Sequence, residues 1–389
     1  MSYETPHNDL LNWNVTNYDN DLVDQAIQKT NWDRICERAS SIKGLPCRPL
    51  NKITNGLHNL VRLLEFSDST QWIARISLYR SDTVSKTLRG EVDVMHLVKA
   101  RSKLPVPRVF AYEIDENNPI GVPYILMEFI PGNTAMDAAG GYQVHQGRIP
   151  RDHRQVFYRS VAECHVQMSS LRFPKIGIVF KGTNGEYDIG PFPDIGGPFE
   201  TAAAFFEAWA EHASFPLEKD EILQMMGKGP AQRVLNAINE FPSRIKEMSC
   251  LISRKNHGPF PLCHRDFFHS NTIVNKAFEV IGVIDWESAS TLPLELVAFP
   301  SFLASMPAQF SLPERYDKDG LPLDEEEKQR WQDQQDYVHM VKAAEHDDHL
   351  LSTCLSDKRN LALAYSLAAF SQGKLGFYDS VLDEQERSD

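Results

Sequence analysis

Residues 262–274 read Leu-Cys-His-Arg-Asp-Phe-Phe-His-Ser-Asn-Thr-Ile-Val, and this segment contains the strongest motif of the sequence. Asp266 is followed five residues later by Asn271, and the chain then enters an apolar run that predicts a strand. Residues 280–287 read Val-Ile-Gly-Val-Ile-Asp-Trp-Glu, a second predicted strand that delivers Asp285 at its end. A hairpin of these two strands would return Asp285 beside Asn271.

This combination of side chains suits one kind of chemistry. A loop aspartate can accept the proton of an acceptor hydroxyl. An asparagine and a second aspartate supply the oxygen ligands that Mg²⁺ prefers when it binds ATP phosphates. Two such motifs, in this order and at this spacing, are the pattern of phosphoryl-transfer enzymes.

The motifs resemble those of the aminoglycoside phosphotransferase and choline kinase-like enzymes, especially their fungal members. In that family the catalytic loop reads like H-G-D-x-x-x-x-N and the metal motif like I-D-W-E, and residues 264–271 and 284–287 match them. The resemblance extends from about residue 51 to about residue 300. It implies that Asp266 is the catalytic base, that Asn271 and Asp285 hold magnesium, and that His264 braces the loop. ATP and Mg²⁺ are the implied cofactors.

The segment upstream of these motifs is rich in predicted strands. Alternation predicts strands at 60–66 and 71–76 around a turn at 67–70, then a helix at 84–101 and strands at 109–114 and 124–130. Later segments predict helices at 152–170, 199–212, 231–248, 324–345 and 359–376, a loop at 181–198, and little strand before residue 263. We therefore expect an α+β, protein-kinase-like bilobal fold, with a small β-rich N-lobe and a large, mainly helical C-lobe.

The expected domains follow from this division. Residues 1–50 form a partly helical lead-in, with an amphipathic helix at 23–39. Residues 51–130 form the nucleotide-binding N-lobe, and a hinge lies near 128–132. Residues 131–389 form the C-lobe, with the catalytic loop, the metal motif and the acceptor pocket.

The N-lobe holds the residues that the resemblance assigns to the nucleotide. The segment 54–59, with Gly56 and Asn59, stands where the family has its phosphate-covering loop. Arg75 stands on the third strand where protein kinases place lysine, and these two cations are not interchangeable. Early in the next helix, Glu91 matches the acid that pairs with this cation. The hinge backbones of Glu128 and Ile130 would meet the adenine edge.

Several features favour a small-molecule acceptor over a protein. The metal motif is Asp-Trp-Glu rather than Asp-Phe-Gly, no Ala-Pro-Glu or activation loop follows it, and roughly 130 residues separate hinge and catalytic loop. Material of that length would wall off an acceptor pocket. Acidic residues bind cationic acceptors in the family, and Glu207, Glu211 and Glu287 are the candidates here. The expected activity is transfer of the γ-phosphoryl group to an alcohol; a pseudoenzyme acting as a binding module and a divergent protein kinase are the alternatives.

Composition limits the partners. A net charge of −13 argues against nucleic acid, because phosphate binding needs a basic surface. No stretch approaches the roughly 20 apolar residues of a membrane helix, and no secretory signal is evident. The six cysteines are scattered, as is typical of free intracellular thiols, so a cytoplasmic location is expected. The acceptor's identity and the oligomeric state are not predicted.

Overall fold

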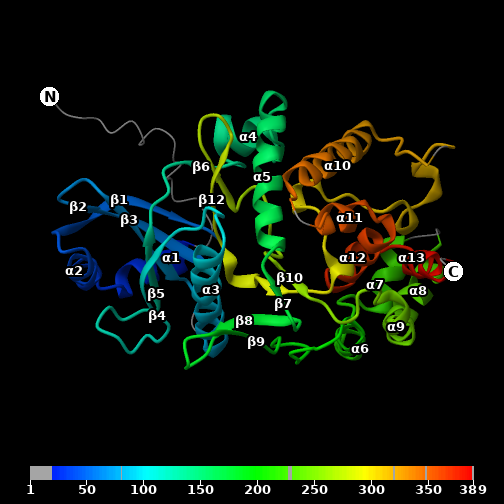
Figure 1. The fold of residues 1–389 in the computed structure, drawn as a ribbon, viewed down its shortest axis with the longest axis horizontal. Helices are drawn as coiled ribbons and strands as arrows, with labels where there is room; N and C mark the ends of the chain where they lie inside the picture. Colours follow the sequence, from blue (N-terminus) through cyan, green and yellow to red (C-terminus); the bar gives the residue numbers. More distant parts are fainter. Residues whose placement is uncertain (1–19, 80, 227–229, 319, 347, 388–389) are drawn as a thin grey trace. The chain divides into compact units, whose positions relative to one another are not determined.

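The computed structural model describes residues 20–79, 81–226, 230–318, 320–346 and 348–387, and the chain divides into two compact units (Figure 1). The first unit extends to Phe157 and takes up the chain again at Asp266–Ser288. The second comprises Tyr158–Arg265 and the chain from Ala289 onward. Residues 1–19 of the expected lead-in lie outside the described residues.

The centre of the first unit is an antiparallel sheet of five strands in the order β1-β2-β3-β5-β4. Consecutive hairpins build β1 to β3, and α3 then leads to the remaining two strands. The bounds are β1 (Cys47–Asn55), β2 (Asn59–Phe66), β3 (Gln71–Ser77), α3 (Asp82–Arg101), β4 (Val109–Glu113) and β5 (Tyr124–Glu128).

The two faces of β3 carry different kinds of side chain. Trp72, Ala74 and Ile76 are buried in one core with α1 (Asn20–Lys29) and α2 (Trp32–Lys43). Because side chains alternate along a strand, Arg75 lies on the opposite face. The N-terminal helices therefore close one side of the sheet and leave the Arg75 side to the functional residues.

The helix expected at 23–39 is two helices rather than one. Asn31 separates them in an extended conformation, and its side chain accepts a hydrogen bond from the backbone of Arg34. Asparagine is a strong N-cap because its oxygen satisfies an otherwise unpaired N–H of the first turn. The hydrophobic periodicity continues across this break, so the pattern predicted one continuous helix.

A second, three-stranded sheet of the first unit carries the two decisive motifs. Its order is β12-β11-β6, with β6 (Asn133–Thr134), β11 (Thr272–Val274) and β12 (Val280–Val283). The expected hairpin is present, with Thr272 opposite Val283. At Gly132 the chain passes so close to β11 that a Cβ atom would lie 2.5 Å from the carbonyl oxygen of Val274.

This sheet explains why the compact units divide the chain differently from the expected lobes. The expected boundary falls after residue 130, whereas the first unit continues through α4 (Gly141–His145) and the start of α5 (Arg154–Ser169) to Phe157. It also includes the metal motif, because β11 pairs with β6. The expected boundaries at residues 50 and 130 remain a proposal for the functional lobes and do not coincide with the compact units.

The second unit is mainly helical, and with the first it confirms the predicted α+β class. It contains β7 (Arg172–Phe173), β8 (Gly177–Lys181), β9 (Tyr187–Gly190), α6 (Ala202–His212), α7 (Lys219–Met226), α8 (Ala231–Glu247), α9 (Ser249–Ile252), β10 (Phe260–Cys263), β13 (Ser290–Thr291), α10 (Glu325–Ala344), α11 (Leu350–Ser356), α12 (Lys358–Ser371) and α13 (Tyr378–Glu386).

The prediction of a loop over 181–198 was wrong in part. The strands β8 and β9 form a hairpin in a sheet of order β7-β10-β13-β8-β9. Each strand has five residues or fewer, and the turn between them begins at Gly182, whose N–H bonds to the carbonyl of Glu186. Such short strands beside several glycines lack the length that periodicity needs for recognition.

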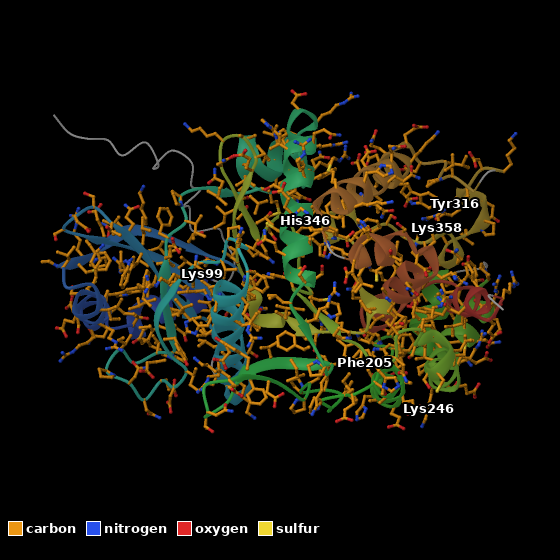
Figure 2. All side chains as sticks on the ribbon, viewed as in Figure 1. Lys99, Phe205, Lys246, Tyr316, His346 and Lys358 are labelled. Carbon is orange, nitrogen blue, oxygen red and sulfur yellow. The ribbon has the colours of Figure 1, made fainter. Side chains whose placement is uncertain are left out.

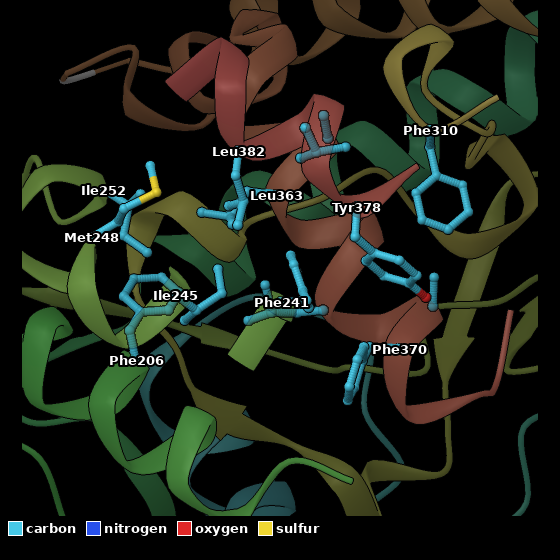
Figure 3. Close-up of a cluster of buried hydrophobic side chains, with 14 of the residues drawn as sticks. Phe206, Phe241, Ile245, Met248, Ile252, Phe310, Leu363, Phe370, Tyr378 and Leu382 are labelled. Carbon is cyan, nitrogen blue, oxygen red and sulfur yellow. The ribbon is translucent and has the colours of Figure 1, made fainter. Parts of the chain in front are cut away.

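The core of the second unit is aromatic, and its residues come from segments far apart in sequence. Figure 3 shows Phe241, Phe310, Phe370 and Tyr378 in one cluster, and the ring centroids of Phe241 and Tyr378 are 4.7 Å apart. Edge-to-face and tilted ring pairs of this kind add to the stabilisation from burial alone. The core gives the helices a fixed framework.

Candidate active site

Asp266 and Asn271 lie in two successive tight turns. The N–H of Phe268 donates to the carbonyl of Asp266, and the N–H of Asn271 donates to the carbonyl of Phe268. The side-chain nitrogen of Asn271 donates to Asp266 twice, at 2.8 Å to Oδ2 and at 3.0 Å to the backbone oxygen. This orientation fixes the carboxylate and turns the amide oxygen of Asn271 away as the atom that can bind a cation.

Asp285 is brought to the same place by the β11–β12 hairpin. The N–H of Ile284 donates to the carbonyl of Asn271 at 3.0 Å, so residues 284–287 begin directly beside the turn that holds Asp266 and Asn271. Asp285 has a φ of 67°, a left-handed conformation that is uncommon outside glycine but that Asp and Asn tolerate. Trp286 anchors the next turn, since it is fully buried and its indole N–H donates to Val283 at 3.0 Å.

Arg75 and Glu91 form a buried, two-pronged ion pair. Nη1 of Arg75 lies 2.6 Å from Oε1 of Glu91, and Nη2 bonds to Oε2. Only 1% of the Glu91 side chain is exposed, and 12% of the Arg75 side chain. Glu91 lies in the middle of α3, not at its start as expected. The same nitrogen, Nη1, also lies 3.9 Å from Oδ1 of Asp285, so the guanidinium connects α3 to the segment that follows β12.

The electrostatics of this pair reflect burial and mutual attraction in opposition. Burial raises the pKa of the Glu91 carboxyl, and the Arg75 guanidinium counteracts that rise. Burial alone would lower the pKa of Arg75, but Glu91, with help from Asp285 and Glu287, raises it above the ordinary value. Arg75 therefore stays a cation and is held in place by carboxylates.

The donor set at this site fits a hard divalent cation. Asp285 contributes a partly exposed carboxylate, and Asn271 contributes an amide oxygen whose nitrogen is fixed on Asp266. Mg²⁺ is commonly bound by one or two protein carboxylates or amides together with waters and phosphate oxygens. Within the described ranges, no three His, Cys, Asp or Glu side chains group as metal ligands do, so the fit rests on Asn271 as well.

The expected phosphate loop is a tight turn between β1 and β2. The N–H of Gly56 donates to the carbonyl of Asn59 at 3.0 Å, which closes the turn. His58 at its tip lies 3.3 Å from Glu287 through Nδ1 and packs edge-on against Tyr79. The sequence analysis missed His58, because its partner is 229 residues away and no local pattern connects them.

The hinge residues lie at the end of β5. The N–H of Glu128 is taken by the carbonyl of Arg108 at 2.8 Å, and its carboxylate accepts the N–H of Arg108 at 3.0 Å. Of the Glu128 backbone, only the carbonyl is therefore a candidate for the adenine edge. Ile130 packs against Gly282 of β12 so closely that a Cβ atom on Gly282 would lie 2.7 Å from Cδ1 of Ile130. The hinge is therefore fixed against the β11–β12 hairpin.

Three further residues named in the sequence analysis, Glu207, Glu211 and His264, belong to the second unit. Glu207 accepts from Ser249 at 3.1 Å, and Glu211 pairs with Lys246 at 2.7 Å, both within the second unit (Lys246 is labelled in Figure 2). Buried His264 also belongs to the second unit. The first unit thus unites Arg75, Glu91 and Asp266 with Asn271 and Asp285. No helix in the described part of the chain is long and apolar enough to cross a membrane.

Comparison with known proteins gives a family match over most of the chain. Residues 49–294 match the family described as the phosphotransferase enzyme family. A subtelomeric hrmA-associated cluster protein of Aspergillus fumigatus is 30% identical over 134 residues, 34% of this chain and 25% of that protein. Altered inheritance of mitochondria protein 9, mitochondrial, of Candida glabrata is 25% identical over 154 residues, 36% and 24% of the two chains. The matched segments cover about a quarter of these relatives.

Solved structures match over a larger share of the chain at lower identity. A macrolide 2'-phosphotransferase from Brachybacterium faecium is 14% identical with a TM-score of 0.41, covering 92% of this chain and 99% of that one. A thermostable aminoglycoside phosphotransferase mutant, in a ternary complex with AMP-PNP and hygromycin B, is 14% identical with a TM-score of 0.44, covering 91% and 99%.

Proposed function

Because this chain belongs to the phosphotransferase enzyme family, as its two motifs indicated, we propose that it transfers the γ-phosphoryl group of ATP to a hydroxyl of a small molecule. One observation carries the proposal. The Asp266 carboxylate is fixed by Asn271, and Arg75, anchored by Glu91, lies 3.9 Å from Asp285. A base, a cation and oxygen ligands thereby share one compact unit.

Asp266 acts as the base in this proposal. Oδ2 receives the hydrogen bond of Asn271, and Oδ1 is then the atom that takes the proton of the acceptor hydroxyl. The fixed orientation is useful because phosphoryl transfer depends on holding the attacking oxygen in line with the leaving group.

Arg75 acts as the phosphate anchor. A guanidinium has five N–H donors, and Glu91 occupies two of its nitrogens on one side. The remaining donors can hold α- and β-phosphate oxygens, as the corresponding lysine does in protein kinases. Asn271 and Asp285 would hold Mg²⁺, which neutralises charge on the phosphates when bound.

The remaining nucleotide contacts come from the loop and the hinge. The turn at Gly56 and Asn59 would cover the phosphates. The carbonyl of Glu128 and the backbone of Ile130 would meet the adenine edge. This division keeps base recognition on the backbone and charge recognition on side chains.

The acceptor is proposed to be a small molecule, and the cell compartment is proposed to be the cytoplasm. The yeast relatives carry the word mitochondrial in their names, so a fluorescent fusion expressed beside a mitochondrial marker would decide the second point. A screen of hydroxyl-bearing metabolites and antibiotics, with generic peptides in parallel, tests the first. Phosphorylation of peptides alone would favour a protein kinase.

The deciding experiment is thermal unfolding with and without Mg-ATP, on the wild type and on Asp285→Asn. Asparagine keeps the side-chain size and tolerates the left-handed backbone, so the variant should fold. At a hundredfold excess over Kd, binding stabilises by about 2.7 kcal/mol. A magnesium-dependent shift lost in Asp285→Asn supports the proposal. A well-folded wild type with no shift overturns it and leaves the binding-module alternative.

A further inference from the structure

A cavity in the first unit adjoins the hinge, and none of the proposed phosphate-binding or magnesium-binding residues lines it. It has a volume of about 540 Å³, and its wall comes from the β2–β3 turn, the start of β3, the end of α3, β4 and the hinge. Neither Arg75 nor Asp285 contributes to its lining. Its size is within the range of small-ligand pockets in proteins, about 300–1,000 Å³.

The cavity lies at the end of the sheet beside the β2–β3 turn, and its lining includes Lys99 of α3, the helix that carries Glu91. Trp72 lines it, and Trp72 and Arg75 point to opposite faces of β3 because they are three residues apart. Glu128 is directly opposite Trp72 on β5 and points the same way. The carboxylate of Glu128 therefore belongs to this cavity, whereas its backbone carbonyl belongs to the hinge.

A layered stack forms one wall. The rings of Trp72 and Phe110 are stacked with centroids 3.7 Å apart and an angle of 10° between their planes. The guanidinium of Arg108 lies over the Phe110 ring at 5.5 Å. The cavity wall therefore combines aromatic rings with the planar cation of Arg108, whose guanidinium can itself stack on a ring.

The polar lining is also biased toward positive charge. Lys99, labelled in Figure 2, and Arg108 are its two cations, and Glu128 is its one carboxylate among the lining residues. Glu128 accepts the backbone N–H of Arg108 at 3.0 Å and lies 3.8 Å from Lys99, whose ammonium also donates to the carbonyl of Val106 at 2.8 Å. Because Lys99 and Glu128 offset each other, the excess positive charge of the lining is the Arg108 guanidinium. Arg108 is an exposed residue, and the net charge of the chain is −13. A pocket with excess positive charge favours an anionic ligand.

We propose that this cavity, which adjoins the hinge but includes none of the proposed phosphate or magnesium ligands, is a second ligand site for a small aromatic carboxylate. The flat ring would lie along the Trp72–Phe110–Arg108 stack, and the carboxylate would bind Arg108 and Lys99. Planar guanidinium groups both stack on rings and bind carboxylates through two parallel hydrogen bonds, so Arg108 can serve both parts of such a ligand.

Calorimetric titration with 2-naphthoate tests the site directly, without ATP or an acceptor. The wild type should bind one equivalent, and Arg108→Gln should weaken binding about tenfold, because it removes a charge-assisted contact. Lys103→Gln is the matched control: Lys103 is exposed nearby on the same unit but does not line the cavity. It should bind as the wild type does, and thermal unfolding confirms that all three proteins fold.

Two comparisons define the ligand and the place. The neutral 2-naphthamide should bind about tenfold more weakly than the acid, because it lacks the charge that Arg108 and Lys99 recognise. Mg-ATP should leave naphthoate binding unchanged, and Asp285→Asn should bind naphthoate like the wild type. Absence of saturable binding, equal binding by Arg108→Gln, equal binding of the amide, or displacement by Mg-ATP would each overturn the proposal. Naphthoate binding without any Mg-ATP binding would reject the proposed activity and keep this site.

Discussion

The side-chain amide of Asn271 donates a hydrogen bond to the Asp266 carboxylate at 2.8 Å. The proposed base and a proposed magnesium ligand are thus held together: the amide nitrogen of Asn271 positions the Asp266 carboxylate, and its amide oxygen is the proposed magnesium ligand. A short turn held by backbone hydrogen bonds supports both residues. This arrangement makes their separate contributions testable.

Replacing Asp266 should separate catalysis from nucleotide binding. In Asp266→Ala we expect phosphoryl transfer to fall about a thousandfold, the range seen when a general base is removed. Mg-ATP should still raise the melting temperature, because the proposed nucleotide ligands Arg75 and Asp285 remain. Release of ADP in the presence of an accepted hydroxyl compound measures the first effect, and thermal unfolding measures the second.

The companion variant Asp266→Asn keeps the size of the side chain but cannot take a proton. It should be as inactive as Asp266→Ala. Normal turnover in either variant would mean that another group accepts the proton.

Removing the charge of Glu91 should cost stability as well as activity. Glu91→Gln leaves the Arg75 guanidinium buried with only part of its compensation, and breaking a buried ion pair costs about 3 kcal/mol. The free energy of urea unfolding measures this loss. Arg48→Gln is the control, since it breaks an ion pair with Glu65 in which 73% of the arginine side chain is exposed, and it should change stability by about 1 kcal/mol or less. Similar losses in the two variants would contradict the buried role of the pair.

The close approach at the hinge predicts a steric effect. Gly132→Ala would place a Cβ atom 2.5 Å from the carbonyl oxygen of Val274 and 2.7 Å from Cγ2 of Ile273. Overpacking of this kind costs about 2 kcal/mol. In the matched variant Gly56→Ala the new Cβ meets nothing within 4 Å, so stability should stay the same or rise slightly. A melting temperature of Gly132→Ala equal to that of Gly56→Ala would show that the hinge relaxes freely.

The sequence was sufficient where chemistry and local structure coincide. Asp266, Asn271 and Asp285 lie within two short segments joined by a hairpin, so spacing alone predicted that they would meet. Arg75 and Glu91 were predicted from the resemblance to the family, which places a cation on the third strand and its acidic partner in the next helix. Both strands of this hairpin, β11 and β12, are apolar runs that can be recognised in the sequence.

The rest depended on contacts between distant segments. His58 meets Glu287 across 229 positions of sequence, and Trp72 stacks on Phe110 only because β4 lies beyond β5 in the sheet. The break at Asn31 depends on one capping hydrogen bond within a continuous apolar pattern. The two long-range contacts leave no periodic signal and could not be predicted, whereas the cap at Asn31 is a local contact that the continuous apolar pattern obscured.

A buried histidine of the second unit predicts how stability depends on pH. His165 is 5% exposed, and its Nδ1 lies 3.1 Å from the hydroxyl of Tyr337. Burial lowers the pKa of His165 to about 4, against about 6.5 for an unfolded histidine.

The sign of the effect follows from proton uptake. Between pH 6.5 and 4 the unfolded chain holds a proton on this residue that the folded chain does not, so unfolding takes up protons and stability falls as the pH falls. At pH 5 the loss amounts to about 2 kcal/mol relative to pH 7.5. In His165→Gln that part of the loss should disappear, while His257→Gln, which removes an exposed histidine of the same unit, should lose stability like the wild type. Urea unfolding at the two pH values measures it, and an unchanged pH dependence in His165→Gln would show that His165 is protonated in the folded protein.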